Sequence, residues 1–302
     1  MSVAAQRRRR DLLYQLLIVA LLLAAGAYLV FNTAQNLRAR GIPSGFDFLW
    51  QAAGFDIGDS MIAFEASAPY WQALLAGLLN TLRVALLGIV LSAILGTVLG
   101  VGRLSRNFLL RSLSGAYVEV FRNIPLLLQL LAWYFVLTDL LPPLDQAWRV
   151  GTGLSLSKSG LALGEALSLT PEFLAVLAGL VFYSAAYLAE TVRAGVLAVP
   201  AGQLAAAAAL GLTRGATLCH VVLPQALRLI MPPATNQFLS LTKNSSLAIA
   251  VGYPDLVSVA NTTLNQTGRA VECVSLIMGV YLALSLATSL FMHWAERRAA
   301  WA

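Results

Sequence analysis

The sequence predicts an all-α, polytopic helical membrane protein with about six transmembrane helices. Of the 302 residues, 59% are hydrophobic and only 11% are charged, whereas soluble domains carry about 25% charged residues. The mean hydropathy is +0.75. Apolar runs of about 20 residues, the length that crosses the hydrocarbon core as a helix, recur along the chain. This composition excludes a soluble globular domain, a disordered or collagen-like chain and a disulfide scaffold.

The expected spans follow these apolar runs. They cover residues 12–31, 78–101, 116–140, 173–195, 229–252 and 273–294. A basic segment precedes the first run, as in a signal peptide, but this run is longer than the usual apolar region of about 7–15 residues, and further runs follow it. We therefore expect three parts: residues 1–76 with the first helix and an external loop, a helical core at 77–294, and a short tail at 295–302.

The basic residues favour one orientation. An even number of spans puts both termini on one side, which then holds Arg7–Arg10 and Arg297–Arg298 together with the links after the second and fourth spans. Because segments rich in Lys and Arg stay in the cytoplasm, we expect both termini to be cytoplasmic. The net charge of +6 is thus distributed as in a membrane protein, and we expect no nucleic-acid partner. Residues 32–70 and 142–171 contain Gly, Pro and charged residues and are expected to form loops outside the membrane.

The third span contains Glu119 and Arg122, which lie three residues apart and therefore on one face of a helix. Pro125 follows within one turn and interrupts the backbone ladder, so that the helix would expose polar groups to a cavity. Two interpretations stay open: an ion pair near the interface, or a substrate pathway formed with Asn123 and Gln129.

The fourth span repeats the spacing with Glu190 and Arg193, which we expect to form a structural ion pair that fastens the cytoplasmic end of this helix. Tyr183 and Tyr187 lie four residues apart on the same helix. They form either a packing face with hydrogen-bonded hydroxyls or, for Tyr187, part of a substrate pathway.

The fifth span places Lys243, Asn244, Ser245 and Ser246 consecutively in an apolar run. Such a run of donors and acceptors is costly against lipid, so it indicates either a polar pathway or a hydrogen-bonded seam between helices. We expect the pathway.

The sequence carries no sign of an enzyme or of a metal site. Cys219 and Cys273 stand far apart, without a Cys-x-x-Cys motif. Lys158-Ser159 lacks the glycines of a phosphate-binding loop, so we expect this chain to bind no ATP and no other cofactor. His220 and His293 are expected at membrane surfaces rather than in a catalytic pair, and no catalytic residue is assigned.

The link between the fourth and fifth spans, residues 199–227, predicts a pair of short helices. An alanine-rich helix, a glycine turn, a second helix and a proline stop follow one another. The pair is too short to span the membrane, and its small side chains suit the groove of a partner protein, although a simple connector would also fit. The residues assigned to docking are Ala205, Ala206, Ala207, Gly211, Val221, Leu223 and Pro224.

This link resembles the cytoplasmic loop of ABC importer permeases, which reads Glu-Ala-Ala, three residues, Gly, nine residues and Ile-x-Leu-Pro. The chain matches this pattern from Ala206 to Pro224, with Val221 in place of Ile. Ala205 stands where the family usually has Glu, so a salt bridge from this position to the ATPase is not carried over. The resemblance extends from about Leu75 to Ala295.

Further landmarks are similar to the polar amino-acid branch of these permeases, whose members transport general L-amino acids or glutamate, glutamine, aspartate and asparagine. These landmarks lie at residues 80–82, 119–129, 187–195, 224–228 and 242–268.

The resemblance implies the type I ABC importer transmembrane fold in a bacterial inner membrane. It implies that the chain pairs with a second permease or with itself, with two ATPase subunits that use ATP and Mg, and with a periplasmic amino-acid-binding protein. Transport would proceed by alternating access. The alternative from another class is a stand-alone secondary transporter or channel, in which the charges in the spans would bind coupling ions.

Overall fold

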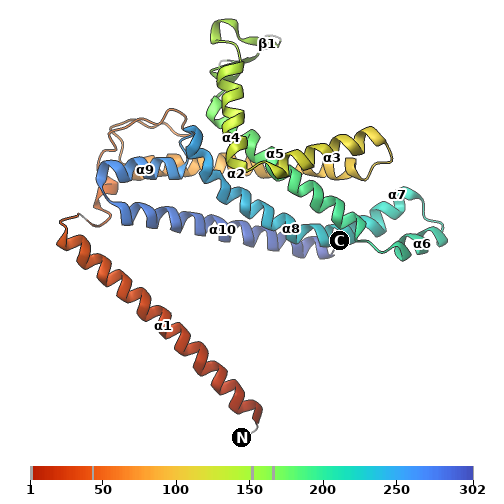
Figure 1. The fold of residues 1–302 in the computed structure, drawn as a ribbon, viewed down its shortest axis with the longest axis horizontal. Coiled ribbons are helices and arrows are strands. Elements are labelled where there is room, and N and C mark those ends of the chain that lie inside the picture. The colour runs from red at the N-terminus through yellow and green to blue at the C-terminus, as the bar shows by residue number, and fades with distance from the viewer. Residues whose placement is uncertain (1–2, 43, 151–152, 165–166, 302) are drawn as a thin grey trace.

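The computed structural model describes residues 3–42, 44–150, 153–164 and 167–301 and is mostly helical. Its core consists of long helices that pack side by side (Figure 1). The helices are α1 Val3–Ala39, α2 Tyr70–Arg103, α3 Phe108–Asn123, α4 Leu126–Phe135, α5 Pro171–Leu197, α6 Ala201–Ala209, α7 Arg214–Thr217, α8 Leu223–Asn244, α9 Leu256–Thr267 and α10 Ala270–Trp301.

Four helices in the described part of the chain are long and apolar enough to cross a membrane, namely those at Arg10–Ala39, Tyr70–Arg103, Pro171–Leu197 and Ala270–Arg298. The bent pair of α3 and Leu126–Leu140 adds a fifth if it forms one broken span. A helical membrane protein is therefore confirmed, whereas the number six stays a prediction. Helix α8, which covers most of the expected fifth span, is not among these helices because polar side chains and two internal prolines interrupt its apolar sequence.

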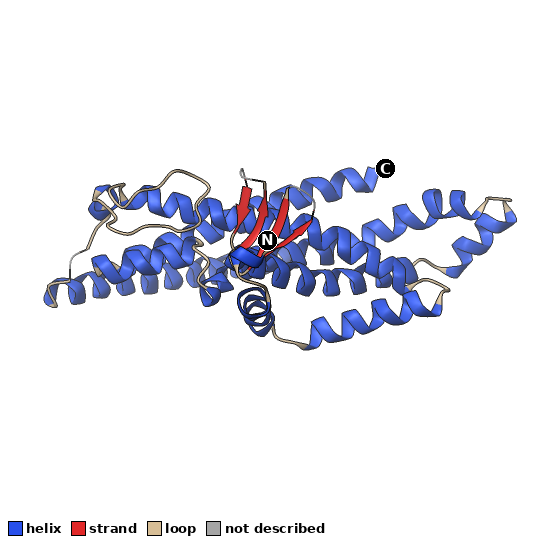
Figure 2. Ribbon diagram, turned by 90° about the horizontal axis from the view of Figure 1, so that it is seen from above, coloured by secondary structure: helices blue, strands red, loops and turns tan. Residues whose placement is uncertain are grey.

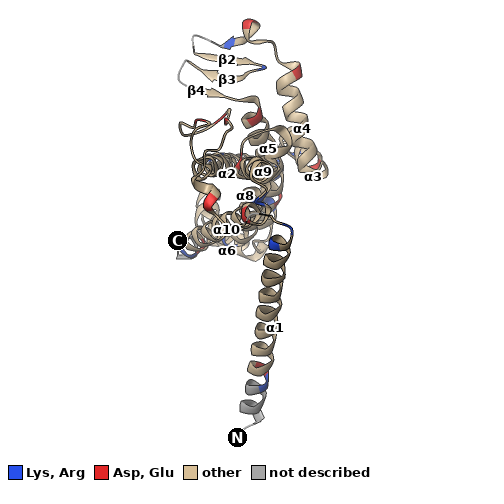
Figure 3. Ribbon diagram, turned by 90° about the vertical axis from the view of Figure 1, so that its left-hand side faces the viewer, with Lys and Arg blue, Asp and Glu red and all other residues tan. Residues whose placement is uncertain are grey.

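Helix α1 leads away from the rest of the molecule (Figure 1), and the apolar part of it is exposed along its length. No charged residue lies between Asp11 and Arg38, so the middle of the helix is uniformly uncharged (Figure 3). This pattern suits a helix surrounded by lipid.

Helices α2 and α5 pack at very short distance. A Cβ atom added to Gly96 of α2 would lie 2.6 Å from Cβ of Leu188, and one added to Gly100 would lie 2.8 Å from the carbonyl oxygen of Ala189. Glycine at these positions lets the two backbones approach, as is common between helices in membranes. Helices α3, α4 and α8 also pack against α5 of this pair.

The break predicted at Pro125 is present, and α3 and the following helix meet there at 105°. The buried Gln129 amide donates to the carbonyl oxygens of Phe121, at 2.8 Å, and Ile124, at 2.9 Å. These bonds replace helical hydrogen bonds that are lost where the helix turns. Gln129 therefore stabilises the bend from within the protein.

The expectation that residues 142–171 form a plain loop is wrong. The segment contains an antiparallel meander of four strands, shown in red in Figure 2: β1 Trp148–Val150, β2 Leu154–Ser157, β3 Gly160–Leu163 and β4 Leu167–Leu169, in the order β1-β2-β3-β4. The register pairs Ser157 with Gly160 across the turn at Lys158-Ser159. The alternating Leu and Ser of β2 have the period of two that favours a strand, a signal that the short length of the segment hid.

The segment at residues 44–69, which is also expected to be a loop, is held against α2, the start of α5 and the residue before α10. Arg269, directly before α10, pairs with Asp47 at 3.1 Å and donates to the carbonyl oxygen of Gly45 at 2.8 Å. Asp59 pairs with Arg83 of α2 at 3.1 Å and accepts from Thr170, which caps α5, also at 3.1 Å. This segment is thus an ordered cap rather than a free loop.

Candidate functional site

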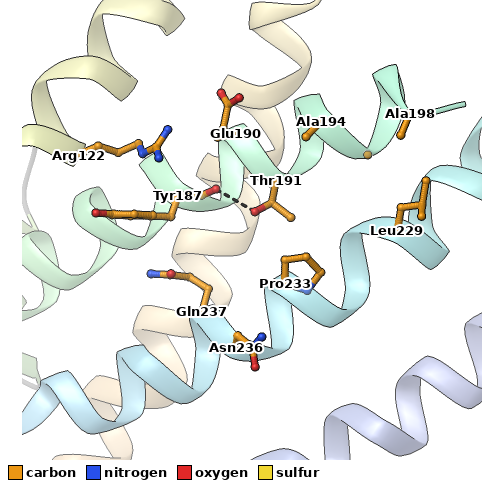
Figure 4. A pocket seen from close by; sticks show the side chains of 11 residues that line it. Arg122, Tyr187, Glu190, Thr191, Ala194, Ala198, Leu229, Pro233, Asn236 and Gln237 are labelled. Atoms are coloured by element: carbon orange, nitrogen blue, oxygen red, sulfur yellow. Dashed lines mark hydrogen bonds between the residues drawn. The ribbon is translucent and has the colours of Figure 1, made fainter.

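A cavity of about 540 Å³ lies between α3, α5 and α8. Its wall is a mixture of polar and small side chains, which Figure 4 shows from close by. They are Arg122 at the end of α3, then Tyr187, Glu190, Thr191, Ala194 and Gly195 of α5 and Ala198 directly after it, and Leu229, Pro233, Asn236 and Gln237 of α8. The size suits a small organic ligand.

Arg122 reaches the cavity because α3 ends at the break. Its guanidinium lies over the ring of Tyr187, 5.0 Å from the ring centre, as a cation–π contact. Among the described residues no carboxylate lies within ion-pair distance of Arg122, including Glu119 one turn before it, which is exposed on α3. The hydroxyl of Tyr183 donates to that of Tyr187 at 3.3 Å. Arg122 is therefore a cation that is positioned by the ring of Tyr187 and whose N–H groups can donate hydrogen bonds to a ligand.

Glu190 forms ion pairs with two arginines. Arg193, one turn further on, lies 2.5 Å from it, and Arg103 at the end of α2 also pairs with it. The carboxylate thus joins α2 to α5 where both helices end. Two guanidinium groups share this one carboxylate and Arg122 is nearby, so the groups around the cavity carry an excess of positive charge, although the lining itself contains one arginine and one glutamate.

The structure separates the other residues that the sequence assigns to a pathway. Asn123 is exposed beside the break, and Gln129 is buried in the bend that it stabilises. Ser245 is buried and donates to the carbonyl oxygen of Thr242 at 2.8 Å. Neither Glu119 nor any of these three lines the cavity.

Lys243 and Ser246 line a second cavity, of about 490 Å³, together with side chains of α9 and α10 that include Tyr281 and Ser285. Asn244 lies beside it, half-buried. Lys243 follows Gln237 by six positions, and with 3.6 residues per turn the two side chains leave α8 in different directions. Asn236 and Gln237 therefore face the first cavity, whereas Lys243 and Ser246 face the second. That Arg122 and Lys243 both contact the substrate stays a prediction.

The predicted helix pair on residues 199–227 has formed as α6 and α7. Gly211 joins them with φ of +72°, a left-handed conformation that favours glycine, and the amide of Leu212 donates to the carbonyl oxygen of Ala207 at 3.1 Å. Ala205 and Ala206 are exposed, whereas Ala207 is buried. The pair projects at the far end of the molecule from the cap (Figure 1).

Pro224 does not stop the second helix, contrary to expectation. α7 continues through a π-helical turn at Leu218–Val222 into α8, and the amide of Leu223 donates to the carbonyl oxygen five residues back, on Leu218. This wider turn shifts the hydrogen bonds so that the first turn of α8 accommodates a proline without an N–H group. Leu223 is exposed, and Val221 and Pro224 are half-buried beside it.

Sequence reasoning missed several residues of the first cavity. Asn236 and Gln237 stand in the expected fifth span, as polar as the 243–246 group, and Gln237 follows Pro233 by one turn. Thr191 follows Tyr187 by one turn and donates to its carbonyl oxygen at 3.0 Å. A search for polar residues at a spacing of four would have found Thr191, four positions after Tyr187, and Asn236, four positions before Ser240, but not Gln237.

A bundle of membrane-spanning helices with a polar cavity among them and a helix pair projecting at one end defines the class of membrane permeases. Residues 65–301 match the family of inner membrane components of binding-protein-dependent transport systems. The chain belongs to this family.

Relatives and a solved structure place it more closely. It is 38% identical to the general L-amino acid transport system permease protein AapQ of Rhizobium johnstonii, over 94% of this chain and 91% of that protein. It is 34% identical to the glutamate/glutamine/aspartate/asparagine transport system permease protein BztB of Rhodobacter capsulatus, over 95% and 92%. The crystal structure of an amino acid ABC transporter with histidines superposes with a TM-score of 0.59 at 28% identity, covering 76% of this chain and 95% of that one.

Proposed function

We propose that this chain is the membrane-spanning permease subunit of an ATP-driven ABC importer for polar L-amino acids. The observation that carries the proposal is the family match over the helical core, together with relatives whose names specify amino-acid transport. The cavity between α3, α5 and α8 agrees with such a substrate, because the guanidinium of Arg122, which pairs with no carboxylate in the described part of the chain, is a good partner for the carboxylate of an amino acid.

The partners proposed are a second permease, either a homologue or another copy of this chain, two ATPase subunits and a periplasmic amino-acid-binding protein. ATP and Mg are used on the ATPase subunits. Both termini face the cytoplasm of a bacterium, and the chain lies in its inner membrane among lipids. The α6–α7 pair, which projects from the bundle, is then the docking point for an ATPase.

In this proposal the transporter works by alternating access. ATP binding draws the ATPase subunits together, the motion reaches the bundle through α6 and α7, and the helices reorient around the substrate. Arg122 holds the carboxylate of the amino acid, and Lys243 and Ser246, which line the second cavity, provide a second polar contact.

Affinity purification of the tagged chain from its native membranes tests the proposal. We expect an ATPase and a second permease to co-purify. We expect liposomes that contain the complex to take up labelled glutamate, glutamine or aspartate when the binding protein is added outside. This uptake should require ATP on the side of the membrane that carries the ATPase subunits. A lone chain that transports without nucleotide would replace the proposal with a secondary transporter.

A further inference from the structure

Two adjacent prolines, Pro232 and Pro233, lie inside α8. A proline has no backbone N–H, so the carbonyl oxygen of Leu229 does not receive the usual helical hydrogen bond from Pro233, and Pro232 also provides no donor. Two successive donors are thus missing from the backbone ladder. Helices bend most easily where such bonds are absent, which makes this point the weakest along α8.

The part of α8 before the prolines is held by the end of α5. Ala226 is fully buried and packs in a cluster with Val199 and Val222. Ile230 covers Gly195 of α5, where a Cβ atom would overlap it. Residues 223–231 of α8, which we call its inner part, are thereby fixed to α5 within one turn of the prolines.

The part after the prolines is held by other helices. Thr235 donates to the carboxylate of Glu296 on α10 at 2.9 Å. Leu241, which is fully buried, covers Gly88 of α2, where a Cβ atom would lie 3.2 Å from its side chain. The two parts of α8 are therefore anchored on different neighbours, and the prolines lie between the anchors.

The cavity lies at the same place. Leu229 and Pro233 line it on either side of the missing bonds, and Asn236 and Gln237 line it just beyond them (Figure 4). With Ile230 fixed on α5, bending at the prolines moves Asn236 and Gln237 toward or away from Tyr187 on the facing helix. The width of the cavity is thus tied to the angle of α8.

The inner part of α8 is also continuous with the projecting helix pair. From Arg214 to Asn244 the backbone stays helical through the π-helical turn, with no loop in between. Because this segment is helical throughout, a tilt of α7 also moves the part of α8 that leads to the prolines.

From these contacts we propose that Pro232 and Pro233 form a hinge in α8 through which a tilt of α7 opens and closes the cavity between α3, α5 and α8. The inference rests on the proposed function, because the tilt of α7 comes from the ATPase that docks there. Beyond that function, the hinge names the two residues through which the movement of α7 reaches the cavity.

Paired substitutions test the hinge in the assembled, reconstituted transporter. The variant P232A/P233A restores both N–H donors and stiffens the helix, and we expect ATP-driven amino-acid uptake to fall about tenfold while assembly is retained. The variant P232G/P233G restores the same donors but keeps the backbone easy to bend, so it should retain about a third or more of the uptake. Equal losses in the two variants would overturn the hinge and indicate that the proline rings only pack.

A distance measurement gives a readout independent of transport. Cys219, which is exposed in the π-helical turn, and a cysteine introduced by Ser240→Cys take spin labels on either side of the prolines, whereas Cys273 is buried. We expect the distance between the labels to differ between nucleotide-free and ATP-trapped complexes, and this difference to shrink by at least about half in P232A/P233A. An unchanged difference in that variant would also overturn the hinge. If the unsubstituted complex takes up no amino acid with ATP, the proposed function fails instead.

Discussion

At the scale of single residues, charge is placed where the helices end or break. Arg122 occupies the end of α3 at the 105° bend, and Glu190 joins Arg103 and Arg193 where α2 and α5 end. Charges inside a membrane are stable only when they are paired or face a polar cavity. The paired set is structural, whereas Arg122 faces the cavity and is available to a ligand.

Replacing Arg122 by Gln should raise the KM for amino-acid uptake about tenfold, because a charge-assisted hydrogen bond to the substrate carboxylate is lost. Uptake kinetics in reconstituted complexes measure this change. Glu119→Gln is the matched control, since Glu119 lies on the same helix but outside the cavity. A KM that is unchanged in the Arg122 variant would exclude it from the substrate site.

Replacing Lys243 by Met removes the cation from the second cavity and should lower uptake about tenfold or more, because a hydrogen bond to a charged group contributes about 1.5–3 kcal/mol. Lys243→Arg keeps the charge and is expected to preserve most of the transport. Normal uptake kinetics of the Met variant, in a complex that assembles fully, would reject a direct role for Lys243.

At the scale of elements, the contact of α2 with α5 depends on glycine. Gly96 leaves no room for a Cβ atom against Leu188, so even alanine forces the helices apart. Helices α3, α4 and α8 pack against α5 of this pair, and the cavity lies along the same α5. Packing of α2 on α5 therefore fixes one wall of the site.

Gly96→Ala should destabilise the protein by about 1–3 kcal/mol, as overpacking does in other cores. Thermal unfolding of the purified complex, followed by its intrinsic fluorescence, checks the value. Gly115→Ala is the control, because a Cβ atom there meets no other atom within 4 Å and alanine favours the helix. Equal stability of the two variants would contradict the tight contact.

At the scale of the whole molecule, the cap at residues 44–69 and the helix pair α6–α7 lie at opposite ends of the bundle (Figure 1). Between them α8 runs from the helix pair past the cavity toward the cap. A movement at one end can therefore reach the other only through the packed helices, and α8 provides the most direct connection.

Gly211→Val should reduce both co-purification of the ATPase and ATP-driven uptake, while membrane insertion survives. A β-branched residue with φ of +72° costs about 1–2 kcal/mol and distorts the joint between α6 and α7, although no neighbouring atom lies within 4 Å. Gly202→Val changes the same helix pair without a left-handed backbone and serves as control. Transport at the normal level in the Gly211 variant would argue against docking at this joint.

The class of this protein follows from the amino-acid sequence alone, because an excess of apolar residues, runs of membrane length and the 199–227 pattern are local properties that need no contacts to be recognised. It also indicated the break at Pro125 and a glycine turn before the second short helix, since both depend on the chemistry of one residue. Which polar residues lie together became clear only from the packing of the helices. Arg122 and Gln237 come from helices far apart in sequence, and the direction in which Lys243 leaves α8 follows from how that helix packs. Contacts between distant segments are set by packing, which a local pattern does not specify.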